Sequence, residues 1–187
     1  MAKDHNPTYL KKTDLIDILD RTIGFIRNCD NKAAIFLGTV GVILTIVLTT
    51  DGLSSLLSII NSAIKQKSFF AILYLLTMFC AIISILFGLS QMIKVLDATI
   101  GFPSKAGLEE NSVIFFEPIS NNKYLEYKKR IYRTTEEEFL NDITSEIYIN
   151  ACICSGKYKN YKHGLRWTLC GFCVFMVFWA IGTIFFS

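Results

Sequence analysis

Three long apolar runs without a charged residue dominate the hydrophobic and polar pattern of this 187-residue chain. They cover residues 33–50, 69–93 and 167–186, which is 18, 25 and 20 residues. An α-helix rises about 1.5 Å per residue, so about 20 apolar residues cross the hydrocarbon core of a bilayer. The sequence therefore predicts an all-α membrane protein with three transmembrane helices, at 33–50, 69–93 and 167–187.

Helical periodicity continues two of these spans beyond their apolar runs. Thr134 and Thr135 are each followed three residues later by a glutamate, which gives two overlapping capping boxes for a helix that leads into the third span. We expect the first and third spans to extend into the cytosol as amphipathic stalks that pack together with a small helical cap. The apolar residues that lead into the first span recur at helical spacing: Leu15, Leu19, Ile23 and Ile26.

The segments outside the spans complete the predicted organisation. Residues 1–32 form the cytosolic N-terminal amphipathic helix, residues 51–68 a short external loop, and residues 94–166 the cytosolic cap and stalk helix. Lys and Arg number six before the first span, two between the first and second, and eleven between the second and third. Because basic residues accumulate on the cytosolic side, we expect the N-terminus in the cytosol and the C-terminus outside.

Two charged residues stand directly before the first span and, with Ala33, form a membrane-entry motif. At about 100° per residue, Asp30 shares a helix sector with the small residues that follow it. Lys32 lies on the other side, where its long side chain reaches lipid headgroups. A carboxylate beside a bilayer is costly unless it is paired or solvated. The candidate partners of Asp30 are Arg27, Lys157, Lys159, Lys162 and Arg166.

Small and polar residues recur on one face of each of the first two spans. Such a face lets helices pack closely, within one chain or in a homo-oligomer, or it lines a water path in an assembly of several subunits. The sequence leaves both interpretations open. The face on the first span comprises Ala34, Gly38, Gly41 and Thr45, and that on the second comprises Thr77, Ala81, Ser84, Gly88 and Gln91.

Motifs of known chemistry are missing from the sequence. There is no glycine-rich phosphate loop, nucleophile elbow or kinase signature, and the one Cys-x-x-Cys pair lies inside the third span. We expect no enzyme activity, no metal or other cofactor, and no nucleic-acid partner. A basic, aromatic-rich patch in the cap either binds an anion or a nucleotide base, or faces anionic lipid. It comprises Tyr124, Tyr127, Lys128, Lys129 and Arg130.

Several short motifs follow one another along the chain. Asp30-Asn-Lys-Ala-Ala34 stands at the entry to the first span, and after the hairpin of spans comes Phe115-Phe-Glu-Pro-Ile119, then an acidic helix start. Glu146-Ile-Tyr148 and Lys157-Tyr158 lead into the last span. In this order the motifs resemble the Pycsar effector transmembrane family, whose first span has an Asp-x-Lys-Ala entry, and the likeness covers about residues 13–186.

The resemblance implies a bacterial inner-membrane effector of anti-phage defence. In such a system a cyclase makes a cyclic nucleotide upon infection, and the membrane effector oligomerises and impairs membrane integrity, which halts the infected cell. Only 32 residues precede the first span, too few for a separate nucleotide-binding domain. Sensing is therefore assigned to the cap or to a separate partner protein. The alternative is a non-permeabilising membrane scaffold or receptor that recruits a soluble partner through its cytosolic cap.

Overall fold

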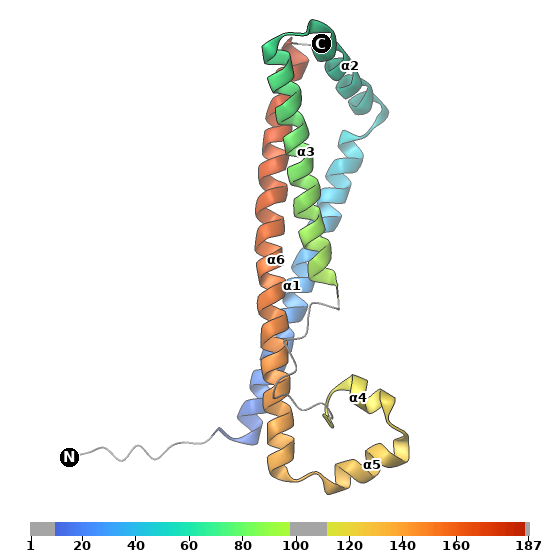
Figure 1. Ribbon diagram of the computed structural model, residues 1–187, viewed down its shortest axis with the longest axis vertical. Coiled ribbons are helices and arrows are strands. Elements are labelled where there is room, and N and C mark those ends of the chain that lie inside the picture. The colour runs from blue at the N-terminus through green and yellow to red at the C-terminus, as the bar shows by residue number, and fades with distance from the viewer. Residues whose placement is uncertain (1–9, 98–111, 186–187) are drawn as a thin grey trace, which may run out of the picture. The chain divides into compact units, whose positions relative to one another are not determined.

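The computed structural model describes residues 10–97 and 112–185, and all regular secondary structure in these ranges is helical (Figure 1). Three of the helices, α1, α3 and α6, are long and apolar enough to cross a membrane. The predicted all-α fold with three membrane-crossing helices is thereby confirmed. The helices are α1 (Lys12–Val47), α2 (Thr50–Gln66), α3 (Phe69–Leu96), α4 (Phe116–Asn121), α5 (Tyr124–Arg133) and α6 (Glu136–Phe185).

Both α1 and α6 run uninterrupted well beyond their apolar segments, over 36 and 50 residues. The start of α6 is fixed by one of the two predicted capping boxes. The Glu138 N–H donates to the Thr135 hydroxyl at 3.2 Å, and the Thr135 N–H donates to the Glu138 carboxylate at 2.8 Å. Thr134 instead donates its hydroxyl to the Arg130 carbonyl at 2.9 Å and ends α5.

The expected short loop at 51–68 is mostly helix, which corrects the prediction made from its place between two spans. Helix α1 ends at Val47 and α2 begins at Thr50. The segment is helical because its leucines and isoleucines gather on one side and its serines on the other, with Asp51 in the first turn. Lys67 ends α2 in the left-handed conformation, at φ 45°.

The described chain forms two compact units, divided after Asn28 in α1 and after Gly156 in α6. The cap unit contains the N-terminal part of α1, helices α4 and α5, and the N-terminal part of α6. The bundle unit contains the rest of α1, helices α2 and α3, and the rest of α6. Each unit has its own buried residues, and each is described by itself below.

Helices α3 and α6 of the bundle unit approach each other through glycines. A Cβ atom on Gly164 would lie 2.9 Å from the Gly88 carbonyl oxygen, and one on Gly171 would lie 2.8 Å from the Ala81 carbonyl oxygen. Distances this short leave no room for a side chain, so the two backbones meet directly. Within the bundle unit α3 and α6 accordingly lie side by side (Figure 1).

Two hydrogen bonds from α3 side chains fix the register of α3 against α6. The Tyr74 hydroxyl donates to the Phe178 carbonyl at 3.0 Å, and the Ser84 hydroxyl donates to the Trp167 carbonyl at 2.9 Å. The two helices run antiparallel, since the later residue of α3 bonds to the earlier residue of α6. The apolar core beside this seam comprises Val47, Ile59, Ala63, Ala71, Tyr74, Met78, Ala81, Ile85 and Phe175.

Candidate functional site

Lys157 joins three helices of the bundle unit. Its side chain is 6% exposed, and its ammonium nitrogen lies 2.7 Å from Oδ1 of Asp30 in α1. The same ammonium donates to the backbone carbonyl of Val95. Val95 belongs to the last turn of α3, where the backbone carbonyls have no N–H partner within their own helix. One lysine of α6 therefore holds α1 by an ion pair and caps the C-terminal end of α3.

The apolar surroundings of this junction make it a structural clamp. Cys29, Ala33, Met92 and Val95 are each 0% exposed. Of the five basic residues that the sequence offers to Asp30, Lys157 is the partner. The other two residues of the membrane-entry motif lie on different sides of α1, as the helical periodicity predicts: Ala33 is buried and Lys32 is exposed. The aromatic and leucine side chains that surround the clamp are Phe36, Leu37, Tyr161 and Leu165.

The small-residue face of the second span packs inside the protein. Ala81 and Gly88 are buried against α6, and Ser84 bonds to it. Thr77 donates to carbonyls of its own helix, those of Leu73 and Tyr74. Gln91 is half-buried at the end of the same face. This face of α3 is therefore occupied within a single chain.

The corresponding face of the first span lies open. Ala34, Gly38, Gly41 and Thr45, here called the α1 small-residue face, are all exposed. A Cβ atom built on Gly38 or Gly41 would meet nothing within 4 Å. The buried side of α1 is formed instead by residues one helix sector away, among them Ala33, Val40 and Val47. Two faces that look alike in the sequence thus have different places in the structure.

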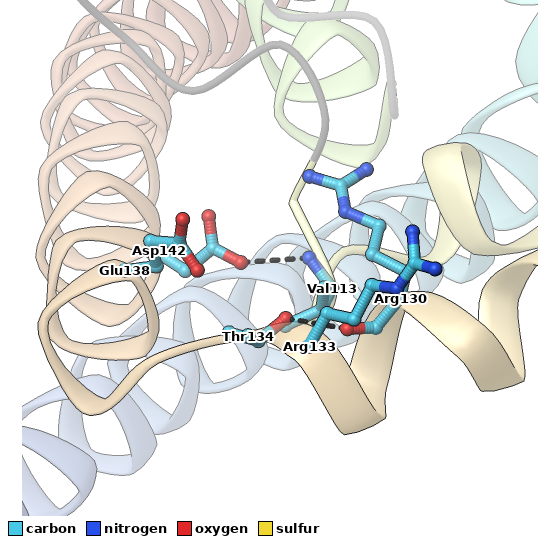
Figure 2. A pocket seen from close by; sticks show the side chains of 6 residues that line it. All are labelled: Val113, Arg130, Arg133, Thr134, Glu138 and Asp142. Carbon is cyan, nitrogen blue, oxygen red and sulfur yellow. Dashed lines mark hydrogen bonds between the residues drawn. The ribbon is translucent and has the colours of Figure 1, made fainter.

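The cap unit holds a polar pocket of about 220 Å³ between α5 and α6 (Figure 2). Figure 2 shows the two arginine side chains on one side of it and the two carboxylates on the other. Of the predicted basic patch, Arg130 lines this pocket, whereas Tyr124, Lys128 and Lys129 lie exposed on α5. The pocket is lined by Val113, Arg130, Arg133, Thr134, Glu138 and Asp142.

Tyr127, the remaining residue of the predicted patch, has a structural contact. Its hydroxyl donates to the Val113 carbonyl at 3.1 Å, and the Val113 N–H donates to the Asp142 carboxylate at 2.7 Å. Val113 is therefore held from both sides, by α5 and by α6. At the start of α6, the Lys12 ammonium of α1 lies 4.4 Å from the centre of the Phe139 ring, a cation–π contact.

Sequence reasoning missed the buried carboxylates of α6. Asp142 is 4% exposed, and Glu146 is 6% exposed one turn later. Burial raises the pKa of Glu146, the nearby Asp142 charge raises it further, and a hydrogen bond from Asn150 lowers it. The available signal was their spacing of four, which places both acids on the same side of α6 as Ile143. A pocket with guanidinium groups opposite carboxylates suits a polar ligand that has both an anionic group and hydrogen-bond donors.

Together these observations define the class: a helical membrane protein with a bundle in which a clamp joins three helices, and with a polar pocket in a separate unit. Among the described residues, no group of His, Cys, Asp and Glu side chains is placed to hold a metal ion. The family model of the Pycsar effector protein domain matches residues 14–185. The chain belongs to the Pycsar effector family, and the resemblance noted in the sequence is confirmed.

Two relatives with this description are similar over most of their length. The Pycsar effector protein GmPycTM of Gulbenkiania mobilis is 26% identical over 176 residues, which is 89% of this chain and 90% of the relative. The Pycsar effector protein EcPycTM of Escherichia coli is 28% identical over 151 residues, 81% of this chain and 79% of the relative. No solved structure matches the chain.

Proposed function

We propose that this protein is an inner-membrane effector of cyclic-nucleotide-linked anti-phage defence, which oligomerises and impairs membrane integrity to halt the infected cell. Membership of the Pycsar effector family supports the role in defence. Three helices able to cross a membrane support action at the bilayer. The protein acts without enzymatic chemistry, with its N-terminus in the cytosol and its C-terminus outside, as the distribution of Lys and Arg favours.

The exposed α1 small-residue face is the observation on which oligomerisation rests. Three helices of one chain are too few to surround a pore, so permeabilisation needs several copies. Small residues let helix backbones of neighbouring subunits approach closely in lipid. Gly38 and Gly41 have open space around them in one chain, whereas Gly88 is already in contact with α6. The α1 face is therefore the surface through which copies assemble.

The pocket of the cap unit is the proposed sensor. The guanidinium groups of Arg130 and Arg133 suit a cyclic phosphate, because planar guanidinium groups donate paired hydrogen bonds to phosphate oxygens. The carboxylates of Glu138 and Asp142 suit the amino group of a base. Titration of the purified chain with 3′,5′-cyclic mononucleotides tests this, with Arg133→Gln expected to abolish binding and the exposed Lys128→Gln to preserve it. Equal binding by both variants would assign sensing to a partner protein.

The assembly proposal is tested with a matched pair of threonines on α1. Thr45 lies on the small-residue face, and Thr39 lies about 120° away at 100° per residue. Both are exposed, and each donates its hydroxyl to the carbonyl four residues earlier at 2.9 Å. We expect Thr45→Phe to prevent oligomerisation and to preserve the membrane potential of infected cells, while Thr39→Phe behaves like the parent chain.

The measurements are crosslinking in membranes and a potential-sensitive dye during infection, with the genomic neighbours of the protein present. Equal assembly by the two phenylalanine variants would contradict the role of the α1 face. Assembly without any loss of membrane potential in the parent chain would favour the alternative, a non-permeabilising scaffold that recruits a soluble partner.

A further inference from the structure

The register of α3 against α6 locates the hydrocarbon core on the bundle unit. Trp167 begins the uncharged run of α6, directly after Arg166, and its carbonyl accepts from Ser84 of α3. From Trp167 to Phe185 the helix rises about 27 Å, close to the thickness of about 30 Å of a bilayer core. The part of α3 that runs beside this stretch begins at Phe69 and is also free of charge. Both helices therefore cross the same layer.

The junction between α1 and α2 lies inside this layer. Leu48, the first residue after α1, lines an apolar cavity of about 230 Å³ together with Ile82 of α3 and Phe172 of α6. Leu53 of α2 lines the neighbouring cavity, which also includes Ile82. Ile82 is two residues from Ser84, which bonds to the Trp167 carbonyl, so the junction lies inside this layer, near its Trp167 side, and not at the outer surface.

This position explains how the first crossing is completed. The apolar helical part of α1, Ala33–Val47, has 15 residues and a length of about 22 Å, which falls short of a bilayer core. Helix α2 continues from there and packs beside α3, with Ile59 2% exposed and Ala63 1% exposed. A Cβ on Gly182 of α6 would lie 2.8 Å from the Ile59 side chain. Together α1 and α2 form one discontinuous crossing, a construction that membrane transporters use around polar pathways.

The outward side of α2 is polar at this depth. At about 100° per residue, its charged and hydroxyl-bearing positions fall within one sector of the helix. The exposed members are Asp51, Ser54, Ser58, Asn61 and Lys65, here called the α2 polar face. Lipid offers these groups no hydrogen bonds, and an intramembrane carboxylate that faces hydrocarbon is strongly unfavourable. Water must cover the face, and in an assembly the same face of other copies bounds that water.

We infer that the α2 polar face lines a water-filled path between assembled copies, with Asp51 as the carboxylate of that path. A ring of carboxylates inside the hydrocarbon layer favours hydrated monovalent cations over anions. This inference rests on the proposed oligomeric function and assigns the path to α2. The face of α3, which the sequence also offered as a pore lining, is occupied by α6.

Depth is tested with the full chain in liposomes, its six cysteines replaced and one fluorescent nitrobenzoxadiazole group placed on a new cysteine. Leu53→Cys is compared with Leu76→Cys, midway along the part of α3 that lies beside Trp167–Phe185, and with Phe69→Cys, at its start; all three side chains are exposed. We expect lipids brominated near the chain ends to quench the Leu53 probe as strongly as the Leu76 probe. Quenching like that of the Phe69 probe would place α2 at the surface and overturn the inference.

Water access is tested on two adjacent residues of α2 whose side chains point about 100° apart around the helix. Ser58 belongs to the polar face, and Leu57, 52% exposed, belongs to the apolar side. A membrane-impermeant trimethylammonium thiosulfonate should modify Ser58→Cys at least about tenfold faster than Leu57→Cys, because only the polar face is in contact with water. Equal rates would overturn the inference, provided each variant inserts like the parent.

The selectivity of the path separates this inference from the proposed function. In a permeabilising parent chain, Asp51→Asn should lower the cation-over-anion permeability ratio several-fold, and Asp51→Glu should retain it. A permeabilising chain with an inaccessible Ser58→Cys refutes the α2 path alone. A deep, accessible α2 in a chain that never permeabilises supports the path and refutes the proposed function.

Discussion

Replacing Asp30 with asparagine is the sharpest test of the three-helix clamp. The change keeps the size of the side chain but removes the charge that faces the Lys157 ammonium at 2.7 Å. Because the Lys157 side chain is 6% exposed, its positive charge cannot recover the missing interaction from water. The Val95 carbonyl remains as an acceptor, so the ammonium keeps one hydrogen bond.

The expected cost follows from the burial of the two partners. Removing one member of a buried ion pair costs about 3–5 kcal/mol of unfolding free energy. The Asp30 side chain is 34% exposed, so water screens the pair, and we expect about 2 kcal/mol for Asp30→Asn. Lys157→Met removes the charge itself and leaves mainly the Val95 carbonyl unpaired, which costs about 1 kcal/mol. The double variant should therefore be more stable than Asp30→Asn alone.

Thermal or denaturant unfolding of the full chain in detergent, followed by circular dichroism, measures these differences. Lys32→Met is the control, because Lys32 is exposed and should change stability by no more than about 0.5 kcal/mol. The reasoning is refuted if Asp30→Asn is no more destabilising than Lys157→Met, since an uncompensated buried ammonium would then have no measurable cost.

Three further predictions concern other contacts. Gly164→Ala should destabilise the bundle by about 2 kcal/mol in the same unfolding assay, because its Cβ would collide with the α3 backbone, while Gly38→Ala should not destabilise it. Tyr74→Phe should cost about 1 kcal/mol through loss of its bond to the Phe178 carbonyl. The raised pKa of Glu146 means that the folded cap favours the protonated carboxyl. Glu146 therefore stabilises the folded cap fully below the ordinary pKa of 4.5, and this stabilisation is lost as the pH rises through the raised pKa. Glu146→Gln should remove this part of the pH dependence of unfolding, and an unchanged pH profile would contradict it.

The long helices were predictable because local signals agree along them. The Thr135 capping box, the absence of proline in residues 136–185 and the apolar run after Arg166 all favour one continuous α6. The entry motif also limited the partners of Asp30 to five basic residues. Choosing Lys157 among them required the packing of α1, α3 and α6, because a distance between helices is not encoded in a local pattern.

The places of the two small-residue faces could not be derived from the sequence for a similar reason. Gly38 and Gly88 occupy equivalent patterns in two apolar helices. A glycine pattern permits close approach but does not name the partner, which here is α6 for Gly88 and open space for Gly38. Helix α2 was not predicted because its 17 residues are too polar for a transmembrane span, and a segment of this length between two spans is readily interpreted as a loop.

The clamp and the α2 polar face lie at opposite ends of one uninterrupted stretch of α1. From Cys29 to Val47 this helix is about 27 Å long, with Asp30 at its start and the junction to α2 just past its end. The ion pair with Lys157 fixes the rotation and register of that stretch against α3 and α6. That register in turn sets the depth of Leu48 and the direction in which Asp51 points. We therefore expect the pairing of Asp30 to matter to the proposed permeabilisation as well as to stability, because the same helix determines where the polar face of α2 meets the membrane interior.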